Sequence, residues 1–242
     1  EDRVIKFMKD FGNDLDLETI VDQVGNVIIK KPATSGMENR KPIVMQSHLD
    51  MVHQKNNDTT FDFDTQGIEM KIEGDWVKAK GTTLGADNGL GVATIMAILQ
   101  STDISHPEIE ALFTIDEETG MTGAMGLKGG LLNGEILLNL DTEEDDEIGI
   151  GCAGGIDVSA TRSYNEEETP DSIIAYKLEV KGLQGGHSGM QIHEGRGNAN
   201  KIMNRLLFNS FQNYGLRVSK IEGGGLRNAI PRESTAIVVI DK

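Results

Sequence analysis

The chain has 242 residues, 38% of them hydrophobic and 26% charged, which is typical of a folded globular protein. Its formal net charge of −16 repels phosphate backbones and argues against nucleic-acid binding. No apolar run reaches the roughly 18 residues that a membrane span needs, so we expect no membrane partner. The single cysteine, Cys152, cannot form an internal disulfide, which favours a location in the reducing cytoplasm. We expect Cys152 to be a small buried side chain.

The first half of the chain alternates predicted strands with predicted helices. Residues 1–11 have apolar side chains at helical spacing, with Val4, Ile5, Met8 and Phe11 on one stripe. Further elements are predicted as strands at 26–31, 43–47, 109–115 and 135–140, a hairpin over 68–80, a helix at 88–100 and a short helix at 121–127. The 88–100 helix is apolar nearly all round, so we expect it to be buried on several sides. This alternation predicts an α/β fold with a mixed, mostly parallel sheet.

A glycine-rich segment at 149–155 interrupts this pattern, and we place a domain boundary near residue 154. The expected domains are 1–154 and 155–242. In the second domain the predicted elements are strands at 156–163, 173–181, 215–222 and 234–240, with a helix at 197–213. They predict a small α+β unit. The acidic run at 143–147 is most simply a solvated loop. Because the chain starts in a helix and stops in a strand, we expect it to be a piece of a longer protein.

The first candidate site residues are His48 and Asp50, at the end of an apolar strand. Residues two apart in a strand point to the same face, so both side chains can approach one site. A metal-bound imidazole needs its second nitrogen held by an acceptor, which a nearby carboxylate provides. Alone, His-x-Asp is a weak signal because many exposed loops contain it.

Asp87 lies in a glycine-rich segment, 81–91, that leads into the predicted apolar helix. Glycines let the backbone turn sharply and approach a bound group closely. The structural interpretation of Asp87 is a helix N-cap. The functional interpretation is a carboxylate that bridges two cations.

Carboxylates also follow two predicted strands, in Asp116-Glu117-Glu118 and at Asp141. An acidic loop would account for either one in so acidic a chain. However, sites in open α/β sheets gather beyond the carboxyl ends of the strands. Carboxylates crowded there repel one another unless cations neutralise them, and one Glu could then act as a general base.

The mixed set of imidazole and carboxylate donors suits Zn²⁺, with Mn²⁺ or Co²⁺ as possible replacements. A pair of such metals would activate a water for hydrolysis of an amide or an ester. In the second domain, His187 lies in Gly185-Gly-His-Ser-Gly189. It is either an exposed histidine on a tight turn or a donor to a developing oxyanion.

These five motifs, in this order, resemble the co-catalytic zinc exopeptidase family that includes carboxypeptidase G, aminoacylase and succinyl-diaminopimelate desuccinylase. Three segments resemble its aminoacyl-histidine dipeptidase (carnosinase-like) branch in particular: Ser-His-Leu-Asp-Met-Val at 47–52, Gly-Thr-Thr-Leu-Gly-Ala-Asp-Asn-Gly at 81–89 and Gly-Cys-Ala-Gly-Gly at 151–155. The resemblance covers essentially the whole chain. It implies a metallo-exopeptidase that hydrolyses dipeptides, such as Xaa-His, through a water shared by two zinc ions.

The resemblance also implies a role for each candidate metal ligand. His48 would bind one zinc ion, with Asp50 steadying its ring and Asp141 binding the same ion. Asp87 would bridge both ions, and the family often has a cis peptide bond after this residue. Glu118 would bind the second zinc ion.

For the remaining residues, the resemblance implies that Glu117 is the general base. His187 would reach the active site of a partner subunit and stabilise the oxyanion, and Asn228 would contact substrate. The implied fold is a catalytic domain with an inserted lid domain through which two copies form a homodimer. A further histidine that completes the second zinc site in the family has no counterpart after His193. We therefore expect this chain alone to have weak activity or none.

Two other functions stay open at this point. One is a relative with the same metals and another substrate, such as a tripeptide or an N-acyl amino acid. The other is a non-catalytic acidic module that binds divalent cations, favoured by the net charge of −16. Such a module would bind Ca²⁺ through oxygen atoms alone, and it would leave the His-x-Asp motif without an explanation.

Overall fold

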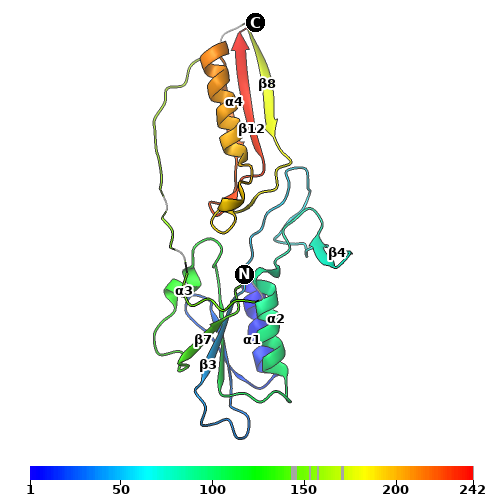
Figure 1. Cartoon of the computed structure of the whole chain (residues 1–242), viewed down its shortest axis with the longest axis vertical. Coiled ribbons are helices and arrows are strands. Elements are labelled where there is room, and N and C mark those ends of the chain that lie inside the picture. The colour runs from blue at the N-terminus through cyan, green and yellow to red at the C-terminus, as the bar shows by residue number, and fades with distance from the viewer. Residues whose placement is uncertain (143–145, 153, 157, 170–171, 242) are drawn as a thin grey trace. The chain divides into compact units, whose positions relative to one another are not determined.

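The computed structural model describes residues 1–142, 146–152, 154–156, 158–169 and 172–241. The chain forms two compact units, Glu1–Glu147 and Ile148–Lys242 (Figure 1). Residues 143–145 of the acidic run lie outside the described residues, so the loop predicted at 143–147 stays a prediction. None of the helices in the described ranges has the length and apolar character needed to cross a bilayer.

The first unit is a mixed α/β layer whose main sheet has five strands in the order β1-β2-β6-β3-β7. Its elements are α1 (Asp2–Asp14), β1 (Glu18–Val21), β2 (Val27–Lys31), β3 (Ile43–His48), β4 (Met70–Glu73), β5 (Trp76–Ala79), α2 (Ala86–Gln100), β6 (Ile109–Thr114), α3 (Thr122–Gly126) and β7 (Ile136–Asn139). Strand β3 runs parallel to β6 and to β7, while β2 pairs antiparallel with β1 and β6. Each strand and helix predicted here is confirmed, and β1 is an addition.

The two faces of this sheet bury different residues because side chains alternate along each strand. One face packs against α1 and α2, which lie side by side in Figure 1. Its buried residues are Met8, Val27, Ile29, Met45, Ile95, Leu99, Ile109, Ala111 and Phe113. On the other face Ile28, Val44 and Leu112 pack with leucines that follow α3. Full burial of a side chain such as Phe113 contributes about 1.5–3 kcal/mol to stability. The alternation of side chains along the strands therefore decides which face of the sheet packs against the helices.

Helix α2 differs from its prediction, because it is buried along one face only. The buried positions are Asn88, Gly91, Ile95 and Leu99, whereas Leu90 is 70% exposed. They recur at a spacing of three or four residues, as expected for a helix packed on one side of a sheet. Because apolar residues occur on all sides of this helix, the sequence could not indicate which side would be buried.

The second unit is a three-stranded antiparallel sheet, in the order β10-β12-β8, with a helix packed on one face. Its elements are β8 (Ile173–Val180), β9 (Gly186–His187), the 3-10 turn η1 (Ile192–Glu194), α4 (Ala199–Tyr214), β10 (Arg217–Gly223), β11 (Ala229–Ile230) and β12 (Ser234–Asp241). Helix α4 begins where the Asn198 side chain accepts a hydrogen bond from the Lys201 amide, and it ends at Gly215 with φ 65°. Met203 and Leu207 are buried against Ala236 and Val238.

Two predictions for the start of the second unit are wrong. No strand forms in the described part of 156–163, where Ile156 is 89% exposed and Val158 is 83% exposed. Apolar side chains alone do not make a strand when no neighbouring strand pairs with them. Cys152 is exposed and not buried, and there is open space around the nearby Gly151, Gly154 and Gly155.

Candidate metal centre

Parallel pairing brings three chain segments with candidate donors to one edge of the sheet. Strand β3 ends at His48, which lies beside Thr114, the last residue of β6. On its other side β3 pairs with β7, with Gln46 opposite Asn139. Because the three strands are parallel, residues just beyond their carboxyl ends share this edge. Glu117 and Glu118 follow β6 there, and Asp141 follows β7.

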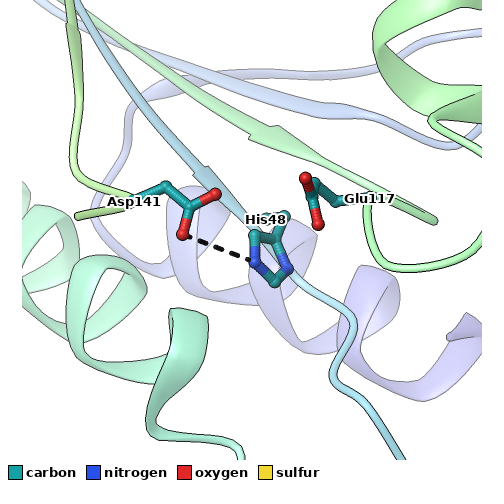
Figure 2. A group of neighbouring side chains, drawn as sticks. All are labelled: His48, Glu117 and Asp141. Carbon is teal, nitrogen blue, oxygen red and sulfur yellow. Dashed lines mark ion pairs between the residues drawn. The ribbon is translucent and has the colours of Figure 1, made fainter. Parts of the chain in front are cut away.

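His48 is 99% buried and has a carboxylate close to each ring nitrogen. Its Nδ1 lies 3.3 Å from Asp50 Oδ1, while Nε2 lies 3.1 Å from Asp87 Oδ1 and 3.8 Å from Asp141 Oδ1. Figure 2 shows the carboxylates of Asp141 and Glu117 on either side of the ring. With Nδ1 held by Asp50, Nε2 is the nitrogen available to a cation.

Asp50 also holds the turn that carries the two glutamates. Its two carboxylate oxygens accept hydrogen bonds from the backbone amides of Glu117 and Glu118, each at 3.0 Å. Just before them Asp116 has φ 53°, in the left-handed region, and its carboxylate accepts hydrogen bonds from Thr119 and Thr122. A single carboxylate therefore fixes both the imidazole and the acidic turn.

Asp87 lies where α2 begins, and its backbone is not helical, with φ −89° and ψ 110°. Asn88 after it is also non-helical, with φ −109° and ψ 32°, so a kink separates Gly85 and Ala86 from the regular part of the helix. The N-cap interpretation of Asp87 stays a prediction. The peptide bond between Asp87 and Asn88 is cis, as the family resemblance implied.

Two overlapping groups of side chains have ligand atoms within 4.8 Å of one another: His48 with Glu117 and Asp141, and His48 with Asp87 and Glu118. The structure thus brings four carboxylates together around one imidazole. In the described part of the chain, His48 is the one histidine in these groups. Such a mixture of one nitrogen and several carboxylate donors can hold two divalent cations.

The crowding of charge shifts the pKa values of these groups. Burial lowers the pKa of His48, but hydrogen bonds to Asp50 and Asp87 and the charge of Asp141 outweigh it and raise the pKa to about 10. Burial and the neighbouring Asp87 and Glu117 raise the pKa of Glu118 to about 7. The pKa of Asp141 is raised to about 6, by burial first and then by Asp87. In the metal-free protein, bound protons reduce the negative charge that is crowded at this site. Divalent cations can neutralise the same donors.

In the second unit, His187 sits in strand β9 on a turn that sets the orientation of its ring. Its Nδ1 accepts hydrogen bonds from the Gly189 amide at 3.0 Å and the Met190 amide at 3.1 Å. Because Nδ1 acts as an acceptor, the neutral ring carries its proton on Nε2, and the residue as a whole is exposed. The carbonyl of Asn228 accepts from the Ser188 amide at 2.8 Å, so Asn228 lies next to this turn.

Sequence reasoning missed two polar residues that support the turn of His187. Gln191 Oε1 accepts from the His187 amide at 2.9 Å and from Arg196 Nη1 at 3.0 Å. Arg196 also donates to the Gly185 carbonyl at 2.7 Å. No spacing in the sequence indicates these contacts, because they arise from the irregular path of the backbone between 185 and 196.

Two family models match the chain. The model described as Peptidase family M20/M25/M40 matches residues 44–209, and the Peptidase dimerisation domain model matches residues 178–242. The first covers more than half of the chain, including all the candidate donors of the first unit.

Individual relatives agree with these matches. The chain is 49% identical to the cytosol non-specific dipeptidase of Escherichia coli over 240 residues, which is 99% of this chain and 50% of that protein. It is 30% identical to the uncharacterized protein YqjE of Bacillus subtilis over 140 residues, 56% of this chain and 32% of that one. The solved aminoacylhistidine dipeptidase of Vibrio alginolyticus is 48% identical and has a TM-score of 0.63, with 100% of this chain and 49% of that chain covered. The chain thus spans half or less of the length of these relatives.

Proposed function

Because the chain belongs to the peptidase family M20/M25/M40, we propose that it forms the metal-binding part of a dipeptidase and takes Xaa-His peptides as substrates. The observation that carries the proposal is the convergence of His48, Asp87, Glu117, Glu118 and Asp141 within the two groups described above. The names of the Escherichia coli and Vibrio alginolyticus relatives support a dipeptide as the substrate class.

We assign the ligands as two sites that share one carboxylate. His48 and Asp141 would hold one zinc ion and Glu118 the second, with Asp87 shared between the two sites. Ions bound there would supply an activated water and polarise the scissile carbonyl. The buried imidazole supports a nitrogen-binding metal over Ca²⁺, which prefers oxygen ligands throughout.

In this proposal the protein's own groups orient the donors and move the proton. Asp50 holds the imidazole and the Glu117–Glu118 turn together, so substrate does not have to order them. Glu117 takes a proton from the attacking water and passes it to the leaving amine. The Nε2–H of the exposed His187 donates to the oxyanion in the active site of a partner subunit, and the neighbouring Asn228 contacts substrate.

The proposed assembly is a cytoplasmic homodimer formed through the second unit. The match to the Peptidase dimerisation domain supports the dimer, and the name of the Escherichia coli relative, a cytosol dipeptidase, supports the location. Helix α4 exposes Phe208 and Phe211, which lie three residues apart on one face, at 64% and 58% exposure. An apolar helix face of this kind is suited to contact with a second copy.

Glu117→Gln provides the test of the proposed function in the purified full-length protein, because this chain alone is expected to have weak activity or none. We expect hydrolysis of an Xaa-His dipeptide to fall at least 100-fold while zinc content, measured by mass spectrometry of the metal, stays unchanged. The matched control is Glu69→Gln, at an exposed glutamate whose ion-pair partner is Lys80. Retained turnover in Glu117→Gln would overturn the assignment of the base. Hydrolysis of tripeptides or N-acyl amino acids in preference to dipeptides would overturn the substrate class.

A further inference from the structure

Three polar atoms gather at Gly91 in the interior of the first unit, next to the candidate metal centre. A Cβ atom built on Gly91 would lie 2.0 Å from Asn88 Oδ1, 2.4 Å from Ser47 Oγ and 2.8 Å from the carbonyl oxygen of Leu140. Asn88 is 3% exposed and Ser47 is fully buried. We refer to the Ser47 and Asn88 side chains and the Leu140 carbonyl as the buried polar cluster.

The buried polar cluster joins the three segments that carry candidate metal ligands. Each of its members is the direct neighbour in sequence of one of them: Ser47 of His48, Asn88 of Asp87 and Leu140 of Asp141. These segments belong to β3, to α2 and to the residues after β7. A contact inside the cluster therefore constrains the spacing of donors that are far apart along the chain.

The Asn88 amide is the central group of the cluster. Its Oδ1 accepts a hydrogen bond from Ser47 Oγ at 3.3 Å, whereas its Nδ2 is buried and has no hydrogen-bond partner among the described residues. A buried donor without a partner is costly. A half-turn of the amide would exchange its two ends and bring the nitrogen, in place of the oxygen, next to Ser47 Oγ.

We propose that Asn88 is a positioning residue whose amide, through Ser47 and the Leu140 carbonyl, sets the distances among His48, Asp87 and Asp141. Gly91 is part of this arrangement, since any side chain there would occupy the space in which the three oxygens meet. The inference rests on the proposed function, because it assigns the cluster a role toward the metal ligands. Outer groups that orient ligands in this way typically change metal affinity by 10–100-fold.

The test compares cobalt binding by the unmodified protein, Asn88→Ala and Ser47→Ala. Co²⁺ is used because its visible absorption reports the geometry of its ligands. We expect both variants to bind Co²⁺ about tenfold more weakly and to shift the absorption bands, because the donors move apart. The control is Thr94→Ala, which removes an exposed hydroxyl on the same helix that donates to the Leu90 carbonyl. Thermal unfolding is recorded in parallel to separate a loss of stability from a change at the metal.

The outcomes separate this inference from the proposed function. If the unmodified protein takes up no Co²⁺, the proposed function fails and the inference fails with it. If the unmodified protein binds Co²⁺ and both variants match it in affinity and spectrum, Asn88 does not position the ligands, even where the melting temperature falls. If Asn88→Ala does not fold, Ser47→Ala alone tests the inference, because this smaller change removes a single oxygen atom. A shifted spectrum in Ser47→Ala, with Thr94→Ala unchanged, supports the inference.

Discussion

Replacement of Glu110 should strongly destabilise the first unit, because this glutamate is a buried charge with four partners. Its side chain lies in β6 and is fully buried. It forms an ion pair with Lys30 at 3.1 Å. It also accepts hydrogen bonds from the backbone amides of Asn133 and Gly134 at 2.7 and 2.8 Å, and from the Asn133 side chain at 3.4 Å. The loop that leads into β7 is thereby fixed to the middle of the sheet.

The size of the effect follows from what Glu110→Ala leaves behind. Removing one partner of a buried ion pair costs about 3–5 kcal/mol. Each buried N–H group without an acceptor costs about 1–3 kcal/mol. These costs overlap, since the same carboxylate serves all its partners, and we expect the free energy of unfolding to fall by about 4 kcal/mol. Glu110→Gln keeps the shape and one acceptor oxygen, so about 2 kcal/mol should be lost.

Urea denaturation followed by far-ultraviolet circular dichroism measures this loss. The matched control is Glu135→Ala, near the same loop, because Glu135 pairs with Lys41 on the surface and both side chains are at least 60% exposed. An exposed pair contributes about 0–1 kcal/mol, so the control should unfold nearly as the unmodified protein does. A loss below about 1 kcal/mol in Glu110→Ala would refute the reasoning, since the buried carboxylate would then be dispensable.

Three further predictions concern the metal centre and the core. Zinc at 100 times its dissociation constant should stabilise the first unit by about 2.7 kcal/mol, and a melting temperature that a chelator leaves unchanged would contradict this. Near pH 7 the metal-free protein holds a proton on His48, with a pKa of about 10, and part of one on Glu118, with a pKa of about 7. Metal binding should displace these protons, so affinity should rise with pH, and calorimetry in two buffers of different ionisation enthalpy should detect the release. Finally, Phe113→Ala should cost about 3–5 kcal/mol in urea denaturation, because Phe113 is fully buried, and a smaller loss would mean that the core refills the cavity.

Much of the first unit could be predicted from the sequence, because short apolar runs and the order of elements carry the information. Short runs of apolar residues in β2, β3 and β6 indicated strands, and the alternation of strands with helices indicated parallel pairing, which β3 forms with β6 and β7. Parallel strands end at a common edge, so the donors after β6 and β7 could be expected near His48. Asp87 was harder to place, since its motif alone also fitted a helix cap. The family resemblance favoured the interpretation of Asp87 as a metal ligand.

Other features have no local signal in the sequence. The burial of Asn88 depends on Ser47 and Leu140, which come from other segments of the chain. The apolar run of α2 could not reveal that Leu90 would be exposed. The strand predicted at 156–163 failed because a strand needs a neighbour, and a run of suitable residues does not supply one. Pairing and burial of this kind are properties of the tertiary structure.

The pairing of β3 with two parallel neighbours has a consequence for how this sequence can change in length. Loss or gain of one residue between Ile43 and His48 would turn the imidazole to the opposite side of the sheet, whereas a change of two would return it to the same side one pleat away. Tolerance of insertions and deletions in this strand therefore depends on whether their length is odd or even. In the connection at 32–42, an insertion or deletion of odd or even length is equally acceptable, because neither reorients His48.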